Sequence, residues 1–348
     1  MKNLPMSVLD VNSGFSWKWY LKDLPLPDKS IKVFSTFSCG GGSTMGYKRA
    51  GFEVIGNVEI DKKINAMYIK NHHPMYNFNM DLRDFNNIEN LPEELFNLDI
   101  LDGSPPCSTF STTGKREATW NVEKQFREGQ KKQRLDDLFF VFLDTVKKLR
   151  PRIVIAENVT GLLKGNAKGY VNEIIKKFHE LNYQLQIFKL NACHMEVPQI
   201  RERIFFIANN QNFLKLKLDF TYPVIPFGKV RSQHGIFVNP NSKYKKFLEQ
   251  ARQTDKNIGD IKERLGLKEN GFSHAIVADT DICYTLIASG NFFRLYDRQY
   301  FSDEDYINVQ TFPQDYDFCD NQAHYICGMS VPPNMMAHIA MEIYKQWL

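Results

Sequence analysis

Cysteine is scarce in this sequence, and the cysteines present form none of the spacings that hold a metal. Six occur among 348 residues, with no CxxC pair and no His/Cys arrangement typical of a zinc site. Few, scattered thiols in a chain of this length favour a reducing compartment over a disulfide scaffold. We therefore expect neither a zinc site nor a disulfide-stapled domain.

Long hydrophobic runs are also missing. No apolar run approaches the roughly 18 residues of a membrane span, and the N-terminus has no apolar core of signal-peptide length. We therefore expect a cytoplasmic protein with no membrane partner. The absence of a GxxxxGKS or GxxxxGKT loop argues against a phosphate-cradling ATPase.

The net charge of the chain is small, but its charged residues are unevenly distributed. The composition, 43% apolar and 24% charged with a net charge of +4, is that of a soluble globular protein with one large or two ordinary domains. Residues 208–270 hold twelve Lys or Arg against six Asp or Glu, and residues 115–134 hold seven against three. Two basic stretches in an otherwise near-neutral chain suggest a surface that binds a polyanion, although a solvated lysine-rich surface would give the same pattern.

From residue 31 onward, short β-branched or apolar runs alternate with amphipathic stretches. This pattern predicts an α/β fold, a mostly parallel sheet with helices on both faces. The expected strands are Ile31–Phe34, Val54–Val58, Asp99–Leu101, Ile153–Ala156, Gln184–Leu190 and Ile204–Ala208. The expected helices are Thr44–Ala50, Lys62–Lys70, Leu135–Leu149, Tyr170–Leu181 and Asn334–Trp347.

The alternation stops near residue 208, where Pro, Asn, Lys and aromatic residues become frequent. We therefore divide the chain into an N-terminal arm (1–30), a first domain (31–207), a smaller second domain (208–320) and a C-terminal segment (321–348) that returns to the first domain.

A glycine-rich turn joins the first strand to the first helix. Phe37 and Ser38 are followed by Cys39 and three glycines, which let the backbone approach a ligand beside the free N–H groups of a helix start. About twenty residues later the second strand ends in Glu59 and Ile60, suited to ribose hydroxyls and a purine face. The pair suggests a nucleoside cofactor, although a glycine turn occurs in other α/β proteins as well.

Three further elements follow at strand ends. A Pro106-Cys107 turn follows the third strand, where Cys107 is either a nucleophile or a buried thiol. Glu157 ends the fourth strand, and Arg201 and Arg203 precede the last one at alternating positions that face one side. Helix capping for Glu157 and surface ion pairs for the arginines are the plain alternatives. It is improbable that the glycine-rich turn and these three elements occur together in this order by chance.

These motifs resemble those of the bacterial and phage DNA (cytosine-5) methyltransferases of restriction–modification systems. The similarity covers roughly residues 31–208 and 284–345, in the family's order. It includes the loop FSCGGGSTMG, the Pro106-Cys107 nucleophile motif, the ENV element at 157–159, the QxRxR element at 199–203, Arg298 with the stretch NVQTFP at 308–313, and GMSVPP at 328–333.

The resemblance implies a Rossmann-like methyltransferase sheet with a smaller, irregular target-recognition domain, and transfer of a methyl group from S-adenosylmethionine to C5 of cytosine. Cys107 would add to C6 of a base flipped out of the duplex, so that C5 becomes nucleophilic. Glu157 would bind the N3/N4 edge and supply a proton to N3. Arg203 would stabilise the base near O2, and Arg201 would orient the site.

The family's cofactor residues carry over onto thirteen matching positions. They are Phe37, Ser38, Gly40, Gly42, Glu59, Ile60, Asp81, Leu82, Ser104, Pro106, Leu138, Ser330 and Val331. No metal is implied.

Duplex DNA is the implied partner of the basic stretches, with a restriction endonuclease in the same system and a monomeric enzyme as further expectations. Residues 108–134 would close over the phosphates, unless they form a simple connector. The candidate DNA contacts are Lys115, Arg116, Arg231, Gln233, Arg294 and Arg298.

The sequence departs from the family at three positions. Ser35 replaces the acid that usually precedes the cofactor loop. Cys39 stands where the first glycine of the loop is usual, and Met329 replaces the common asparagine beside Ser330. If position 39 requires a positive φ, cysteine would be strained there, unless Gly40 adopts that conformation instead. We expect altered cofactor contacts with the nucleophile set intact.

The same core chemistry on tRNA, or a DNA-binding subunit without catalysis, are the alternatives. A nicotinamide dehydrogenase is disfavoured because the loop lacks a full GxGxxG.

Overall fold

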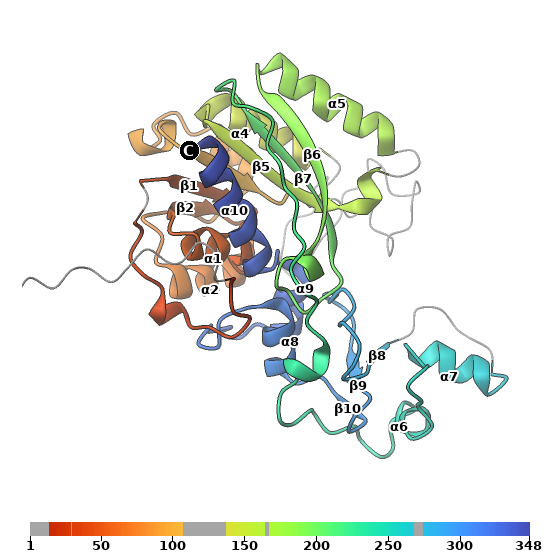
Figure 1. The fold of residues 1–348 in the computed structure, drawn as a ribbon. Helices are drawn as coiled ribbons and strands as arrows, with labels where there is room; N and C mark the ends of the chain where they lie inside the picture. The colour runs from red at the N-terminus through yellow and green to blue at the C-terminus, as the bar shows by residue number, and fades with distance from the viewer. Residues whose placement is uncertain (1–13, 29, 107–136, 164–166, 268–273) are drawn as a thin grey trace, which may run out of the picture.

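A seven-stranded sheet in the order β3-β2-β1-β4-β5-β7-β6 forms the centre of the larger lobe (Figure 1). The computed structural model describes residues 14–28, 30–106, 137–163, 167–267 and 274–348. The strands β3, β2, β1, β4 and β5 pair in parallel, and β7 is antiparallel to both β5 and β6. They are β1 Lys32–Thr36, β2 Glu53–Val58, β3 Tyr76–Phe78, β4 Ile100–Gly103, β5 Ile153–Val159, β6 Gln184–Asn191 and β7 Glu202–Asn209.

Helices cover both faces of this sheet, because neighbouring strand residues point to opposite sides. Val33 packs with α1 and α10 on one face, whereas the next residue, Phe34, packs with α3, α4 and α5 on the other. The helices of the larger lobe are α1 Gly42–Arg49, α2 Lys62–His72, α3 Leu82–Asn86, α4 Leu138–Leu149, α5 Ala167–Glu180 and α10 Pro333–Trp347. The predicted α/β class is confirmed.

The smaller lobe contains a three-stranded sheet and two short helices over a core of its own. Its elements are β8 Ala275–Val277, β9 Phe292–Arg294, β10 Gln299–Tyr300, α6 Lys245–Leu248 and α7 Ile258–Arg264. Strand β9 lies between the other two, parallel to β8 and antiparallel to β10. Leu248, Ile261, Ile276 and Phe293 are among its buried core residues.

Two further helices, α8 Asp303–Gln310 and α9 Ala323–Met329, lie between the lobes (Figure 1). Their buried side chains form one cluster with Met45 and Met67 of the larger lobe and Phe227 of the second half of the chain. Leu216 packs on the α10 face of the large sheet. Residues just beyond position 208 thus still pack on the larger lobe.

Short 3-10 helices complete the described elements: η1 Leu21–Asp23, η2 Glu93–Phe96, η3 Thr160–Leu163, η4 Ala192–His194 and η5 Phe227–Lys229. None of the helices in the described ranges is long and apolar enough to span a bilayer. In the C-terminal segment, α10 packs against α1, where a Cβ on Gly46 would lie 2.5 Å from Cβ of Met336.

Candidate functional site

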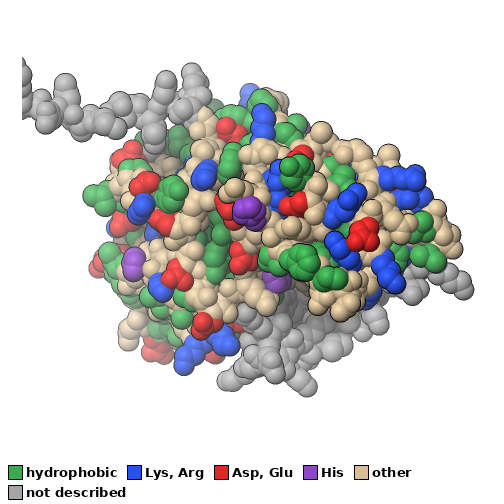
Figure 2. Space-filling view, turned by 90° about the horizontal axis from the view of Figure 1, so that it is seen from below, with side chains coloured by type: hydrophobic (Ala, Val, Ile, Leu, Met, Phe, Trp, Pro, Cys, Tyr) green, Lys and Arg blue, Asp and Glu red, His purple; other side chains and the backbone are tan. Residues whose placement is uncertain are grey.

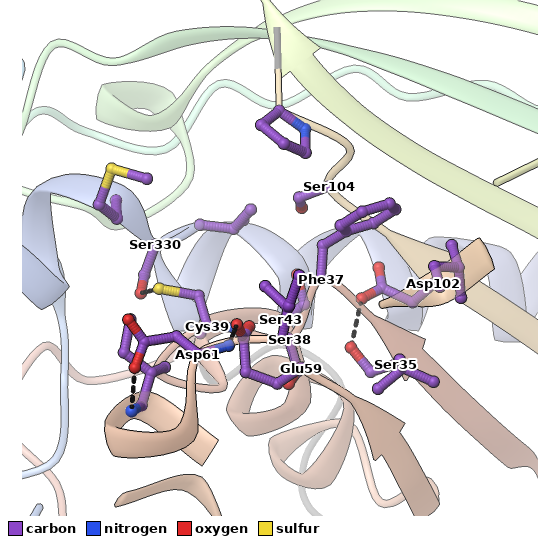
Figure 3. Close-up of a pocket in the computed structure, with 18 of the residues that line it drawn as sticks. Ser35, Phe37, Ser38, Cys39, Ser43, Glu59, Asp61, Asp102, Ser104 and Ser330 are labelled. Atoms are coloured by element: carbon purple, nitrogen blue, oxygen red, sulfur yellow. Dashed lines mark hydrogen bonds between the residues drawn. The ribbon is translucent and has the colours of Figure 1, made fainter. Parts of the chain in front are cut away.

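A pocket opens at the carboxyl ends of β1, β2 and β4, the edge where parallel α/β sheets bind ligands (Figure 3). Its volume, including space open to solvent, is about 1050 Å³. Twelve of the thirteen predicted cofactor residues line it, and Gly40 alone does not. The lining also includes Ser35, Cys39, Ser43, Val58, Asp61, Ile64, Met80, Asp102, Tyr325 and Met329.

The glycine loop packs too closely against the C-terminal segment for side chains to fit. A Cβ on Gly42 would lie 2.1 Å from the carbonyl oxygen of Val331, and one on Gly40 would lie 2.4 Å from Ile326. Gly41, the N-cap of α1, has a φ of 72°. The loop therefore brings the backbone N–H groups at the start of α1 to the pocket, as a nucleoside cofactor with a polar tail would need.

Cys39 itself adopts the left-handed conformation, with a φ of 46°. The suggestion that Gly40 takes over this conformation is therefore corrected, because Gly40 has no positive φ. The Cys39 backbone N–H donates to Glu59 at 2.9 Å, and its sulfur lies 3.9 Å from the Ser330 hydroxyl. Burial, reinforced by the charge of Glu59, raises the pKa of this thiol to about 12.

Two carboxylates on the β2 side of the pocket are fixed by backbone donors. Glu59 accepts from the backbone N–H groups of Cys39 and Asp61, each at 2.9 Å, and burial raises its pKa. Asp81 caps α3 by accepting from the Arg83 N–H at 2.8 Å. Ile60 and Leu82, the residues that follow these acids, supply apolar surface. This combination fits ribose hydroxyls and a purine ring.

Glu157 and Arg203 meet at the same edge of the sheet, in a partly buried ion pair. Arg203 Nε lies 2.8 Å from Glu157 Oε1, and each side chain is 13% exposed. Burial lowers the pKa of Arg203, although Glu157 opposes that shift. The neighbouring Asn158 donates to the carbonyl of Pro105 at 3.1 Å, which ties the end of β5 to the turn that leads to Pro106. Cys107, the predicted nucleophile, lies outside the described residues.

Arg201, which the resemblance assigns to orienting the site, is buried against backbone carbonyls. It is only 2% exposed, and its guanidinium donates to the carbonyls of Leu286, Gly328 and Ser330 at 2.9–3.0 Å. Gln310 donates to the same Ser330 carbonyl at 2.7 Å. These bonds hold the Ser330 wall of the pocket in place, so Arg201 has the geometry of a positioning residue.

The predicted DNA contacts have different environments. Gln233 and Arg298 are exposed, and Arg231 lies 4.1 Å from the Tyr296 ring while it pairs with Asp279 at 3.0 Å. Lys115 and Arg116 lie outside the described residues. Figure 2 shows Lys and Arg side chains gathered at the end of the molecule that the smaller lobe forms.

Arg294 requires a correction. Its side chain is fully buried and pairs with Asp297 at 2.8 Å and Asp305 at 3.3 Å. A guanidinium that two carboxylates hold inside the lobe cannot reach a base edge in this conformation.

Three buried residues of the site were missed. Tyr316 donates to the carbonyl of Gly40 at 2.7 Å, Gln310 reaches Ser330, and Asp102 lines the pocket beneath the glycine loop. Asp102 carried a sequence signal, since a charged residue inside an apolar strand is rarely placed there without a partner. Gln310 lies in the NVQTFP stretch at 308–313, whose similarity to the family was the available signal, whereas Tyr316 lies beyond that stretch and carried none.

Comparison with known proteins agrees with this geometry. The model of the C-5 cytosine-specific DNA methylase family matches residues 31–345. The chain belongs to this family. Among similar members, Type II methyltransferase M.Sau96I of Staphylococcus aureus is 26% identical over 343 residues, covering 91% of this chain and 76% of the relative. Type II methyltransferase M.FnuDI of Fusobacterium nucleatum is 34% identical over 194 residues, covering 56% and 51%.

The match to M.FnuDI thus spans about half the length of that relative. Solved structures agree in fold. A putative DNA modification methyltransferase from an Escherichia coli prophage has a TM-score of 0.65 at 19% identity, covering 91% of this chain and 99% of that one. A Spodoptera frugiperda DNMT2 variant has a TM-score of 0.62 at 17% identity, covering 90% and 100%.

Proposed function

We propose that this C-5 cytosine methylase transfers a methyl group from S-adenosylmethionine to C5 of a specific cytosine in duplex DNA. The observation that carries the proposal is the Glu157–Arg203 pair, on a strand whose Asn158 donates to the carbonyl of Pro105, at the sheet edge that also holds a pocket suited to a nucleoside cofactor. The named Type II relatives support action within a restriction–modification system. A cognate endonuclease that acts on the same DNA is part of the proposal.

The bound cofactor would supply an electrophilic methyl group. Glu59, Ile60, Asp81 and Leu82 would hold its nucleoside, and the glycine loop with Ser330 and Val331 its amino-acid part. This division follows from the residues on each side of the pocket, with acids and apolar side chains near β2 and backbone N–H groups near α1.

On the cytosine, the Cys107 thiolate would add to C6 and form a C–S bond. Glu157 would protonate N3 as negative charge develops there, and Arg203 would hold the carboxyl in place and stabilise the base near O2. C5 would then bond to the methyl carbon as the methyl–sulfur bond of the donor breaks, which would leave S-adenosylhomocysteine. Loss of the C5 proton to water, with breakage of the C–S bond and return of the N3 proton to Glu157, would restore the aromatic ring and the thiolate. A base inside the duplex cannot reach this edge, so base flipping is part of the proposal.

A trapping experiment tests the nucleophile. Duplex DNA that contains 5-fluorocytosine lacks the C5 proton, so the wild-type enzyme with S-adenosylmethionine should remain bonded to it and survive denaturing electrophoresis. Cys107→Ser should form no adduct. An adduct with the serine variant would remove Cys107 from its role. If the enzyme methylates tRNA and leaves DNA unmethylated when both are offered, the substrate is RNA. If DNA is modified, bisulfite sequencing would identify the target cytosine.

The acid role of Glu157 has a matched control in Glu202. Glu157→Gln should lower the methylation rate about 100-fold or more, with DNA affinity nearly unchanged, because the amide cannot supply the proton. Glu202→Gln removes the same charge from an ion pair with Lys189, at 2.7 Å on the surface, and should retain the rate. Single-turnover rates and DNA binding measured on both variants decide the point. Equal losses of rate and affinity in Glu157→Gln would indicate a structural role.

A further inference from the structure

One carboxylate of the pocket is not used by the mechanism above. Asp102 is the register partner of Ser35 on the neighbouring strand, and both line the pocket (Figure 3). The Ser35 hydroxyl donates to Asp102 Oδ2 at 3.0 Å, and the Tyr47 hydroxyl donates to Oδ1 at 3.1 Å. Strand β4 thus supplies the acid that strand β1 lacks at position 35.

The groups around Asp102 leave its charge without a cation among the described residues. Ser35 of β1 and Ser43 and Tyr47 of α1 offer hydroxyl groups, while the charge of Glu157 on β5 opposes ionisation. Burial is the largest cause and raises the pKa of Asp102 to about 7. Tyr47 stays a neutral donor because burial and Asp102 raise its pKa, and the pKa of Tyr68 on α2 is raised as well. A carboxylate offers about four acceptor positions, so the three hydroxyl groups leave room for one further donor from a ligand.

The layout of the pocket indicates which ligand group would reach this acid. Strand β1 lies between β2 and β4. The residues suited to ribose and adenine, Glu59 and Ile60, follow β2, so a cofactor bound there directs its other end toward β1, α1 and β4. That end of S-adenosylmethionine carries an ammonium group.

We propose that Asp102 binds the cofactor directly, its β4 carboxylate accepting a hydrogen bond from the α-ammonium group of S-adenosylmethionine. The inference rests on the proposed function, from which it takes the cofactor. Related sequences usually carry an acid at the position of Ser35 on β1. In this chain the proposal assigns the cation-binding role to Asp102 on the neighbouring strand β4.

The pH dependence has a definite sign. Below about pH 7 the Asp102 carboxyl is protonated and loses its attraction for the ammonium group, so cofactor affinity should fall as the pH decreases. A bound cation lowers the pKa of the acid, and binding near pH 7 should therefore release a proton. Glu59 also has a raised pKa, but it faces the nucleoside. A ligand without the amino-acid part therefore separates the two acids.

Isothermal titration calorimetry of the intact protein with two ligands is the test. S-adenosylmethionine carries the ammonium group, and 5′-methylthioadenosine keeps the nucleoside and thioether without it. At pH 7.0, Asp102→Asn should bind S-adenosylmethionine about 10- to 100-fold more weakly and 5′-methylthioadenosine within about threefold of wild type. Between pH 6 and 7.5, where an α-ammonium with a pKa of roughly 7.7–8.0 stays mostly charged, the variant should lose the pH dependence that is specific to S-adenosylmethionine.

A second variant returns the acid to β1. Ser35→Asp combined with Asp102→Ser should regain S-adenosylmethionine affinity to within about tenfold of wild type, because the two positions are paired. Equal affinity of wild type and Asp102→Asn for S-adenosylmethionine would overturn the inference, as would equal losses for the two ligands. A wild-type protein that binds neither ligand would overturn the proposed function itself, and the inference with it.

Discussion

At the scale of single residues, burial separates the arginines that serve the site from those that hold the fold. Arg203 is partly buried and faces Glu157, whereas Arg201 donates to backbone carbonyls between the lobes. Arg294 pairs with two acids inside the smaller lobe. A guanidinium that serves as a structural cation cannot also be a free DNA contact, even though the sequence presents all three as the same residue type.

Arg294→Met should therefore destabilise the protein rather than selectively weaken DNA binding. Removal of the guanidinium leaves Asp305, itself fully buried, without its cation, and the free energy of unfolding should fall by about 3–5 kcal/mol. Urea denaturation followed by circular dichroism measures the loss. Arg298→Ala, at an exposed position four residues along, should change stability by about 0.5 kcal/mol or less. Unchanged stability of Arg294→Met with reduced DNA affinity would restore the original interpretation as a DNA contact.

At the scale of elements, local pattern was sufficient for the strands and helices that carry the motifs. The runs at 153–156 and 204–208 lie within β5 and β7, because buried strands read as continuous apolar segments. The antiparallel direction of β7 was not predictable, since an apolar run looks the same in either direction. The three-residue β3 and the five-residue α3 were missed, because they are too short to show a period.

The same limit applies within the site. Glycines, Pro106, Glu157 and Arg203 are recognisable by type and order along the chain. The Ser35–Asp102 bond joins residues 67 positions apart and depends on strand register, and the left-handed φ of Cys39 depends on how the loop packs. Sequence pattern therefore placed the motifs but could not supply the long-range hydrogen bonds that fix the pocket.

The close contact between α1 and α10 predicts that a larger residue at Gly46 will destabilise the protein. In Gly46→Ala the new Cβ would lie 2.5 Å from Met336 and 2.7 Å from the carbonyl oxygen of Pro333, so the two helices must separate. We expect a loss of about 1–3 kcal/mol in the free energy of unfolding. The matched control is Gly169→Ala in α5, where nothing lies within 4 Å and the helix should gain up to about 1 kcal/mol. Thermal melts of both variants compare them, and similar melting temperatures would contradict the close approach.

At the scale of the whole molecule, the N-terminal segment links the two halves of the chain. The Trp19 indole donates to the carbonyl of Thr311 at 2.8 Å, and its ring lies 4.5 Å from the Arg49 guanidinium of α1. Trp19 belongs to the cluster that also contains Met45 and Met67 from the larger lobe and Phe301 from beyond residue 208. Because these segments bury the same apolar surface, each half completes part of the core of the other.

The shared core predicts that the lobes unfold together. Differential scanning calorimetry should give a single transition whose calorimetric and van't Hoff enthalpies agree. Trp19→Ala should lower the stability of that single transition by about 3–5 kcal/mol, whereas Trp19→Phe, which keeps an aromatic ring and loses the bond to Thr311, should cost less. S-adenosylmethionine at about 100 times its dissociation constant should add about 2.7 kcal/mol to the whole transition, because a ligand of one lobe then stabilises both. Two resolved transitions, of which the cofactor shifts only one, would show that the cluster does not couple the lobes.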